Sequence, residues 1–554
     1  KSSFNLNDAY VITIEKQPKL RDEIISVKVG NDEAIQHALL TLAQLINQYG
    51  KELPAMIIRD MPVFPNRGFL LDVSRDRVPT MAELLSLIET LAFLKYNHLQ
   101  LYSEHTFAYE KHEIVWQDAS PLTSEEIKSI DAHSRSLGIS LVANQACFTH
   151  LSRWLKHDRY ANLAETNSQW EWEGNKFEGP FSLNPGNPDS IKLVSEMLGQ
   201  LLPNFSSKYI NINCDEAIDL GADRSKDLVR ERGSFEVYWE FVGKIIEIVR
   251  KQKFRPMLWT DVWLKAPKSK RKKFDKDIIA LIWGYEPNTP FASSCHALNA
   301  YEREVWVCPG TSSWRSISGR TLERRANTIE AAIQGLFSGA KGYLLTEWGD
   351  NGHRQQFPIT LYALAEASQT AWSASQVARD GNAISLQVFG DKQHLKITDW
   401  LAKLGNLDLE IRKDANKVKD NGEVVPLTNA TCLFMELDGA FGADAINGSL
   451  KDWGKVEVEL SNLKDNYQPI ANEKINAEVL HILKVLDFAV HKATLRRMAK
   501  SKKNRGVPSL ISKLQSITDE HRKLWLARSR PGGLDDSCEH YDRIVEDLRN
   551  HIKE

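Results

Sequence analysis

The stretch Tyr209-Ile210-Asn211-Ile212-Asn213-Cys214-Asp215-Glu216 decides how the whole chain is interpreted. Its first residues alternate in polarity and include two β-branched isoleucines, which predicts a short buried strand. The strand ends in two adjacent carboxylates, and burying such groups is costly unless each is paired or titrates unusually. The stretch therefore predicts a functional site at a strand end, with a solvated junction between strand and loop as the plain alternative.

Strand and helix patterns alternate regularly between Arg67 and about Trp372. The expected strands are Gly68–Asp72, His98–Ser103, Ser140–Asn144, Tyr209–Asn213, Pro256–Thr260, Ile278–Gly284, Val305–Pro309 and Gly342–Thr346. Helical patterns lie near Met81–Leu94, Ser124–Leu137, Ser190–Leu202, Phe235–Arg250, Phe291–Ala300, Thr328–Phe337 and Ile359–Ser368. This alternation predicts an α/β fold built on a (β/α)8 barrel. A doubly wound open sheet is the alternative, but no Gly-x-Gly-x-x-Gly loop follows the first strand.

The two flanks of the expected barrel differ in kind. Residues 1–64 predict a small α/β segment, with a helix that Asn31 caps and Gly50 ends. Residues 65–372 form the expected catalytic barrel, and residues 373–554 predict a mostly helical C-terminal domain. The long helical patterns of this last part lie near Glu473–Ala499, Pro508–Ala527 and Asp535–Ile552. We expect a helical bundle that packs on the barrel.

Composition and charge exclude several classes of partner. The chain is 42% hydrophobic and 26% charged with a formal net charge of −2, so nothing favours a nucleic acid or a membrane as partner. The six cysteines form no Cys-x-x-Cys pair, which indicates small buried residues rather than disulfides or a zinc site. No apolar run reaches transmembrane length. A cytoplasmic location is the default expectation, although a removed signal peptide would leave the same sequence.

Carboxylates and indoles gather at the ends of the expected strands, where barrels of this kind hold their active sites. The residues found there include Asp72, Arg75, Glu104, Asp215, Glu216, Trp259, Asp261, Trp283, Tyr285, Glu286, Trp314, Trp348 and Asp350. Indoles stack on the apolar faces of sugar rings and carboxylates accept hydrogen bonds from hydroxyls, so the combination favours a carbohydrate. No His-Glu-x-x-His motif and no Gly-x-Ser-x-Gly elbow occurs. We expect no catalytic metal, no cofactor and no serine nucleophile.

Several motifs resemble glycoside hydrolase family 20, the β-N-acetylhexosaminidases. The segment Phe64-Pro65-Asn66-Arg67-Gly68-Phe69-Leu70-Leu71-Asp72-Val73-Ser74-Arg75 is similar to the opening of that family's catalytic domain, and Asp215-Glu216 resembles its catalytic pair. Met257–Val262 and Ala280–Trp283 look like its two later tryptophan strands, and Trp348-Gly349-Asp350 resembles its last Trp-x-Glu. The resemblance covers about residues 1 to 372.

The resemblance implies hydrolysis of terminal, non-reducing β-linked N-acetylglucosamine or N-acetylgalactosamine with retention. Glu216 would be the general acid, and Asp215 would orient the 2-acetamido group, whose oxygen attacks the anomeric carbon in place of an enzyme nucleophile. The implied sugar-binding residues are Arg67, Trp259, Trp283, Trp314, Trp348 and Asp350. The substrate would be an amino-sugar glycan or glycoside.

The chain also departs from the family's pattern. Asn211 and Asn213-Cys214 stand where the family's His-x-Gly-Gly usually precedes the acidic pair, and Asp350 replaces a glutamate. The family's Tyr-x-Asp, whose tyrosine holds the acetamido oxygen, is missing from Thr311–Arg315. Two rival hypotheses remain: an ordinary retaining glycosidase with Glu286 or Asp350 as nucleophile, and a protein that binds amino sugars without cutting them. The choice between the two sugars and a homodimer through the helical end stay open.

Overall fold

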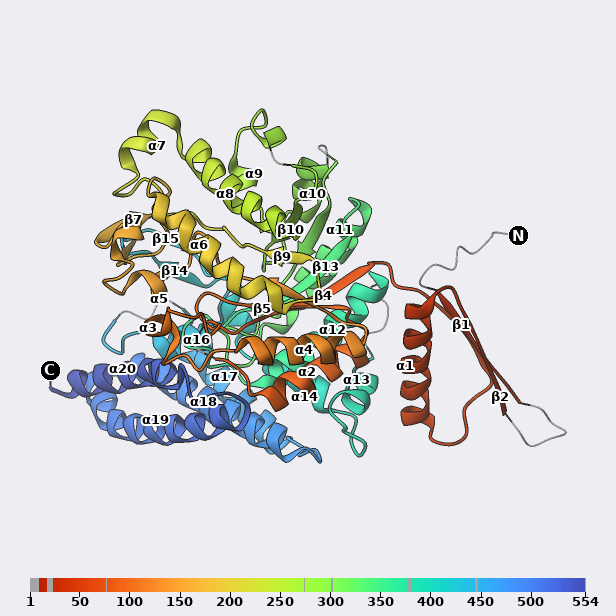
Figure 1. Cartoon of the computed structure of the whole chain (residues 1–554). Coiled ribbons are helices and arrows are strands. Elements are labelled where there is room, and N and C mark those ends of the chain that lie inside the picture. Colours follow the sequence, from red (N-terminus) through yellow and green to blue (C-terminus); the bar gives the residue numbers. More distant parts are fainter. Residues whose placement is uncertain are drawn as a thin grey trace.

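A closed barrel of eight parallel strands forms the centre of the computed structural model, which describes residues 9–16, 23–75, 77–273, 275–299, 302–375, 380–443 and 447–553 (Figure 1). Its strands are β4 (Asn66–Asp72), β5 (His98–Tyr102), β6 (Ser140–Asn144), β9 (Tyr209–Asn211), β10 (Arg255–Trp259), β11 (Ile279–Trp283), β12 (Val305–Cys308) and β13 (Gly342–Glu347). They follow one another around the barrel in chain order, and β13 closes it against β4. The predicted barrel is confirmed.

Helices cover the outside of the barrel and leave its strands buried on both faces. The main ones are α2 (Met81–Phe93), α4 (Ser124–Ser136), α6 (Pro188–Leu201), α8 (Ser234–Lys251), α10 (Phe291–Asn299), α11 (Thr321–Phe337) and α12 (Phe357–Ser373). Inside the barrel, Leu70, Met257, Leu281 and Leu344 pack with bulky aromatic residues. Strands that are apolar toward both faces are typical of parallel sheets covered by helices.

Helix α11 begins at Thr321, seven residues before the expected start at Thr328. Apolar periodicity missed its first two turns because buried polar residues occupy them. Arg324 pairs with Glu366 at 2.7 Å, and the Asn327 amide donates to two backbone carbonyls at the end of β11. The expected end of α10 at Ala300 lies outside the described residues.

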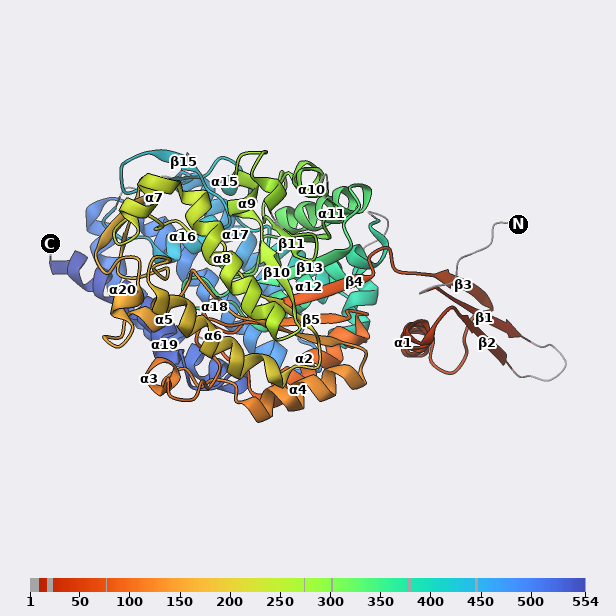
Figure 2. The same cartoon turned by 45° about the horizontal axis from the view of Figure 1, so that its top comes forward.

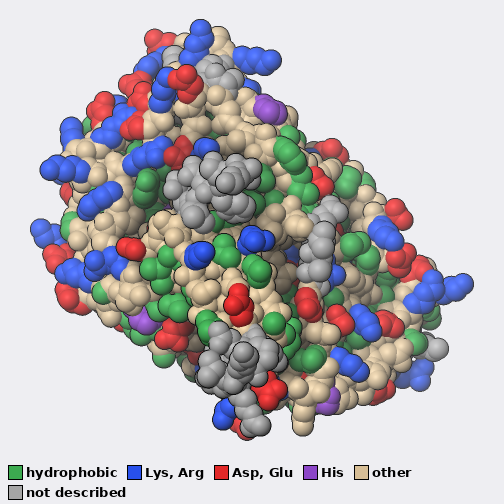
Figure 3. Space-filling view, turned by 90° about the vertical axis from the view of Figure 1, so that its right-hand side faces the viewer, with side chains coloured by type: hydrophobic (Ala, Val, Ile, Leu, Met, Phe, Trp, Pro, Cys, Tyr) green, Lys and Arg blue, Asp and Glu red, His purple; other side chains and the backbone are tan. Residues whose placement is uncertain are grey.

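A small N-terminal unit projects from one side of the barrel (Figures 1 and 2). Strands β1 (Tyr10–Lys16), β2 (Glu23–Val29) and β3 (Met56–Asp60) form an antiparallel sheet in the order β2-β1-β3. Helix α1 (Asp32–Tyr49) packs on it, and the Asn31 side chain caps its first turn as predicted. Figure 3 shows this side of the molecule, where hydrophobic side chains lie among charged ones.

The C-terminal region is mostly helical, as predicted, and packs against the barrel (Figure 2) through an extensive apolar core that it shares with α12. Its helices are α13 (Gly381–Gln387), α14 (Ile397–Leu404), α15 (Leu409–Arg412), α16 (Cys432–Asp438), α17 (Leu450–Asp465), α18 (Glu473–Arg496), α19 (Lys500–Arg528) and α20 (Leu534–Lys553). A short hairpin of β14 (Asn416–Val418) and β15 (Val424–Pro426) precedes α16. No described helix is long and apolar enough to cross a bilayer.

Helix α19 begins eight residues before Pro508, where sequence placed its start. A proline inside a helix removes one backbone hydrogen bond, which favours a start at that residue. Here Val507 and Leu510 on either side of Pro508 are fully buried in the bundle, and their packing holds the helix through the proline. The basic cluster from Lys500 to Arg505 therefore forms the first turns of α19.

A further hairpin was missed from sequence. A hairpin of β7 (Gln169–Trp172) and β8 (Asn175–Glu178) stands in the connection between β6 and α6. Its turn contacts the hairpin of the C-terminal region, because Asn421 N donates to Gly174 O at 3.0 Å and Lys176 N donates to Asp420 Oδ2 at 2.8 Å.

All six cysteines are buried and free, in agreement with their predicted role as small core residues.

Candidate active site

A cavity of about 140 Å³ opens at the carboxyl ends of the barrel strands. Arg75, Tyr102, His150, Asp215, Glu216, Trp259, Trp283, Tyr285, Trp348, Asp350 and Asn429 line it. Six of the eight site residues expected from sequence are brought together here: the acidic pair, three of the four tryptophans, and Asp350. Arg67 and Trp314 lie elsewhere.

The turn that presents the acidic pair has an unusual backbone. Asn213, Cys214 and Glu216 have φ angles of 58°, 62° and 48°, in the left-handed region that non-glycine residues rarely adopt. Two of these residues, Asn213 and Cys214, stand where the resembled family has glycines. Each such residue costs on the order of 1–3 kcal/mol unless its surroundings hold it.

A network of buried amides holds this turn. The Asn213 side chain donates to Asn144 Oδ1 at 2.8 Å and accepts from Trp259 Nε1 at 2.8 Å. Its backbone N–H donates to Asn211 Oδ1 at 3.0 Å, and the Tyr238 hydroxyl donates to the Cys214 carbonyl at 2.7 Å. Asparagine tolerates the left-handed region, and its side chain here makes contacts that a glycine could not make.

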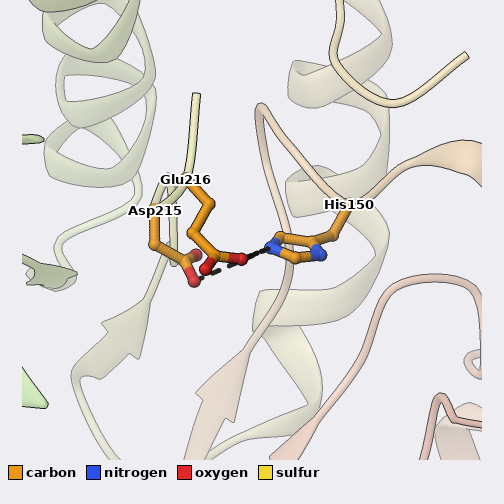
Figure 4. Close-up of side chains that lie close together, drawn as sticks. All are labelled: His150, Asp215 and Glu216. Atoms are coloured by element: carbon orange, nitrogen blue, oxygen red, sulfur yellow. Dashed lines mark ion pairs between the residues drawn. The ribbon is translucent and has the colours of Figure 1, made fainter. Parts of the chain in front are cut away.

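His150 lies beside both carboxylates of the pair (Figure 4). Its Nε2 atom is 3.3 Å from Glu216 Oε2 and 3.7 Å from Asp215 Oδ2. Burial lowers the pKa of His150, but the hydrogen bond to Glu216 and the charge of Asp215 outweigh it and raise that pKa to about 9. Burial raises the pKa of Glu216, yet the hydrogen bond and the positive charge of His150 leave it below its ordinary value. The proton of this pair therefore rests on His150.

Asp215 titrates in the opposite direction. Burial raises its pKa to about 7; the charge of His150 opposes this rise, and the carboxylates of Asp261 and Glu216 add to it. Asp261, which follows β10, also holds the turn, since its Oδ2 atom accepts the backbone N–H of Glu216 at 3.0 Å. The two neighbouring carboxyls thus have separated pKa values, which is the pattern of an acid–base site.

His150, Asp215 and Glu216 each place one potential ligand atom within 4.8 Å of the others. A cation would require a neutral imidazole, because a protonated ring has no lone pair to give. The raised pKa of His150 keeps this ring protonated near neutral pH. The cluster is therefore suited to proton transfer, and a cation bound there would have to displace the proton of His150.

Three indoles form the walls of the cavity. Trp348 Nε1 donates to the Tyr285 hydroxyl at 2.7 Å, and the Tyr285 ring stacks on Trp283 with centroids 5.5 Å apart. Trp259 is tied to the acidic turn through Asn213. Hydrogen bonds and stacking thus fix flat apolar surfaces around the carboxylates, which is how aromatic side chains serve a ligand with both apolar and polar faces.

Arg67 does not reach this cavity, and its predicted role is corrected. It stands at the start of β4, at the opposite end of the barrel, where it donates to the carbonyls of Phe64, Pro65 and Lys95. The arginine in the cavity is Arg75, three residues beyond the end of β4. Its Nη1 atom is 3.2 Å from Glu104 Oε1, and its Nε atom is 3.9 Å from Asp350 Oδ1.

Trp314 is also corrected. Its side chain is fully buried and meets the Tyr285 ring edge-on, with centroids 5.0 Å apart. Tyr285 thereby stands between Trp314 and the cavity. The indole supports the pocket wall from behind, where a sugar cannot reach it.

Sequence analysis placed Arg75 and Tyr285 at strand ends without giving either a specific role, and it did not select three further residues of this cavity. They are Tyr102, His150 and Asn429. Tyr102 is the last residue of β5, so the strand-end signal applied to it as well. His150 follows β6 by six residues and belongs to no histidine motif, and Asn429 belongs to the helical C-terminal region.

Comparisons with known proteins give a family match for the barrel. Residues 64–297 match the sequence profile of the family described as "Glycosyl hydrolase family 20, catalytic domain". A beta-hexosaminidase of Vibrio furnissii is 22% identical over 44% of this chain and 43% of its own length. Beta-hexosaminidase subunit B1 of Dictyostelium discoideum is 25% identical over 66% of this chain and 70% of its own. The chain thus spans less than half of the Vibrio furnissii protein.

Solved structures share the fold. The chitobiase of Flavobacterium johnsoniae superposes with a TM-score of 0.56 at 16% identity, over 94% of this chain and 86% of its own. A family 20 exo-β-N-acetylglucosaminidase of Vibrio harveyi, solved with N-acetylglucosamine, gives a TM-score of 0.55 at 16% identity, over 71% and 67%. At this identity the likeness establishes the fold alone.

Proposed function

Because residues 64–297 carry a glycoside hydrolase family 20 catalytic domain, we propose that this chain is a β-N-acetylhexosaminidase. It removes terminal, non-reducing β-linked N-acetylglucosamine or N-acetylgalactosamine and retains the anomeric configuration. The observation that carries the proposal is the contact of His150 with Asp215 and Glu216 inside an indole-lined cavity. A volume of about 140 Å³ suits one sugar residue better than a chain of them.

Glu216 is the proposed general acid. It must be protonated when the leaving oxygen departs, whereas in the ligand-free site its pKa is lowered by His150. His150 Nε2, 3.3 Å away, is the proton's resting place. We assign to the pair a transfer of this proton from His150 through Glu216 to the leaving oxygen. Such transfer by a positioned side chain contributes roughly 10²–10⁴ to a rate.

Asp215 is the proposed partner of the substrate's 2-acetamido group. In its ionised form it accepts the acetamide N–H, which turns the acetamide oxygen toward the anomeric carbon and stabilises the cationic ring that forms. The Tyr285 hydroxyl lines the same cavity and already accepts from Trp348. We assign the role of the tyrosine missing from Thr311–Arg315 to Tyr285, whose hydroxyl donates to the acetamide oxygen in this proposal.

Arg75 and Asp350 are the proposed ligands of the ring hydroxyls. The Arg75 guanidinium lies over the rings of Tyr102 and Trp348, at 4.9 and 5.5 Å from their centroids, and faces Asp350. A guanidinium and a carboxylate side by side can donate to one hydroxyl and accept from its neighbour. Trp259, Trp283 and Trp348 would hold the apolar faces of the sugar and its acetamido methyl.

An enzyme carboxylate as nucleophile is less well supported. Glu286, one candidate, has both oxygens engaged: Oε2 accepts from Arg320 at 2.7 Å, and Oε1 accepts from the backbone N–H of Asn429 at 2.7 Å. Asp350, the other candidate, faces Arg75. Neither is a free carboxylate aimed at an anomeric centre.

A set of 4-nitrophenyl β-glycosides tests the proposal. We expect release of nitrophenol from the N-acetylglucosaminide or the N-acetylgalactosaminide, and negligible release from the glucoside, which lacks the acetamido group. A thiazoline that mimics the cyclised intermediate should inhibit strongly. Equal turnover of the glucoside, or a glycosyl ester trapped on a carboxylate and found by mass spectrometry, would contradict the substrate-assisted mechanism.

A further inference from the structure

One residue of the cavity comes from outside the barrel. Asn429 lies in the segment between β15 and α16, more than fifty residues beyond the last barrel helix, α12. Every other side chain that lines the cavity lies at the carboxyl end of a barrel strand or in the connection after it. The helical C-terminal region therefore reaches into the site as well as packing on the barrel.

The position of Asn429 is held at several points. Its backbone N–H donates to Glu286 Oε1, and Glu286 is in turn paired with the buried Arg320. Two residues further on, Thr431 N donates to Arg315 O at 3.1 Å and Thr431 Oγ1 donates to Ser316 O at 3.1 Å. These contacts fasten the segment to the loops that follow β11 and β12.

The hairpin before this segment is fastened on the other side of the site. Its turn bonds to the hairpin of β7 and β8 through Asn421 and Asp420. Figure 1 shows β7, β14 and β15 close together at this end of the molecule. The β7–β8 hairpin belongs to the connection that carries His150, so the C-terminal segment bridges loops from both sides of the cavity.

The side chain of Asn429 is left without a partner by this arrangement. Its backbone has a φ of 52°, and its carboxamide oxygen is shielded from water yet accepts no hydrogen bond from any described residue. A buried polar group without a partner costs about 1–3 kcal/mol, and a rotation of the carboxamide that turns this oxygen toward a hydroxyl in the cavity recovers that cost. The carboxamide, half-buried at the cavity wall, is placed to meet a polar group of the occupant.

We propose that Asn429 is a specificity-determining residue, whose carboxamide makes a hydrogen bond with one hydroxyl of the bound amino sugar. The inference rests on the proposed function for the class of ligand. An amide is neutral and can both donate and accept a hydrogen bond. It can therefore recognise a hydroxyl without adding charge to a cavity that already holds Asp215, Glu216 and Asp350. The C-terminal region thereby takes part in choosing the substrate.

Asn429→Gly is the test variant, because glycine keeps the left-handed backbone and the N–H to Glu286 and removes only the carboxamide. Asn421→Gly is the matched control: it removes a carboxamide from the turn of the preceding hairpin, where that group accepts only from Glu423 N among the described residues, and it keeps the backbone N–H that donates to Gly174 O. We expect Asn429→Gly to raise KM for the 4-nitrophenyl N-acetylhexosaminide about tenfold with kcat within about twofold of wild type. Asn421→Gly should change neither constant.

Binding of N-acetylglucosamine and of its 3-, 4- and 6-deoxy analogues, followed by tryptophan fluorescence, identifies the hydroxyl. Wild type should bind one of the analogues more weakly than N-acetylglucosamine because the contacted hydroxyl is missing. Asn429→Gly should bind that analogue and N-acetylglucosamine equally well, as a coupled pair requires. The proposal would be overturned if, for every analogue, the ratio of its Kd to that of N-acetylglucosamine were the same in both proteins. A lower melting temperature with unchanged KM would also overturn it. Absence of any hydrolysis or sugar binding by wild type would instead refute the proposed function itself.

Discussion

The two ends of strand β4 each carry an arginine among aromatic residues, and the two arginines differ in what surrounds them. Arg67, at the amino end, is 2% exposed, lies 5.0 Å from the ring centroid of Trp372, and donates to three backbone carbonyls. Arg75, past the carboxyl end, also lies over aromatic rings. Its partners, however, are three carboxylates, those of Asp72, Glu104 and Asp350.

This difference shows how one strand separates stability from function. At the amino end, Asp60 accepts from Tyr10 and Trp372 and lies 3.7 Å from Lys95, so opposite charges and hydrogen-bond partners satisfy one another. At the carboxyl end, Asp215, Glu216 and Asp261 repel one another and the backbone is held in strained conformations. Stored repulsion and strain are typical of a site that awaits a ligand.

The largest effect is expected from Glu216→Gln at the carboxyl end. Turnover of a glycoside with a poor leaving group should fall about 10²–10⁴-fold, since protonation of the leaving oxygen limits that reaction. An activated aryl glycoside needs less protonation and should retain much more activity. Steady-state kinetics on both substrates measure the contrast, and equal losses would show that Glu216 is not the acid.

The two arginines give the direct test of the comparison. Arg75→Lys should lower kcat/KM about tenfold to a hundredfold with little change in melting temperature, because an ammonium cannot reproduce the planar set of donors. Arg67→Lys should cost about 1–3 kcal/mol of the free energy of unfolding, because buried carbonyls lose their donors, while the folded enzyme turns over normally. Kinetics and urea denaturation on both variants separate the roles. If Arg67→Lys lowered kcat/KM and Arg75→Lys lowered only the stability, Arg67 would be the arginine that contacts the sugar.

The two arginines also show how much of the fold and of the site could be predicted from the sequence. Alternating strand and helix patterns placed all eight barrel strands, because buried parallel strands leave a strong apolar signal. Matching a motif to a family selected Arg67, and only the direction of β4 shows that this residue lies at the wrong end of the barrel. Asn429 could not be found from sequence, since it reaches the cavity through the packing of a separate region.

A smaller, pH-dependent effect is expected from Asp215→Asn. A free aspartate titrates near 4, whereas burial raises the pKa of Asp215 to about 7. Between these values the unfolded chain releases a proton that the folded protein keeps, so the Asp215 charge increasingly penalises the folded state as pH rises to about 7. Asp215→Asn should therefore raise the melting temperature by a few degrees at pH 8 and by less at pH 5.

The control for this effect is Asp60→Asn at the other end of the barrel. Asp60 has hydrogen-bond donors and a lysine beside it, so loss of its charge should lower the melting temperature. A fall in stability for Asp215→Asn at pH 8 would mean that His150 stabilises the Asp215 carboxylate as fully as Tyr10, Trp372 and Lys95 stabilise the Asp60 carboxylate. The contrast between the two ends would then be weaker than the pKa of Asp215 indicates.

The smallest effect concerns the strained turn before the acidic pair. At most buried positions alanine is a better replacement for cysteine than glycine, because glycine loses more entropy on folding. Cys214 has a φ of 62°, where an alanine pays for its Cβ and a glycine does not. Both variants lose the buried sulfur, so Cys214→Gly should be more stable than Cys214→Ala by about 1 kcal/mol in urea denaturation.

Cys147 is the control, because it is equally buried and has no positive φ. At that position the alanine variant should be more stable than the glycine variant. If alanine is also better at residue 214, the amide network around Asn213 relaxes the turn, and the strain attributed to the carboxyl end is not stored there.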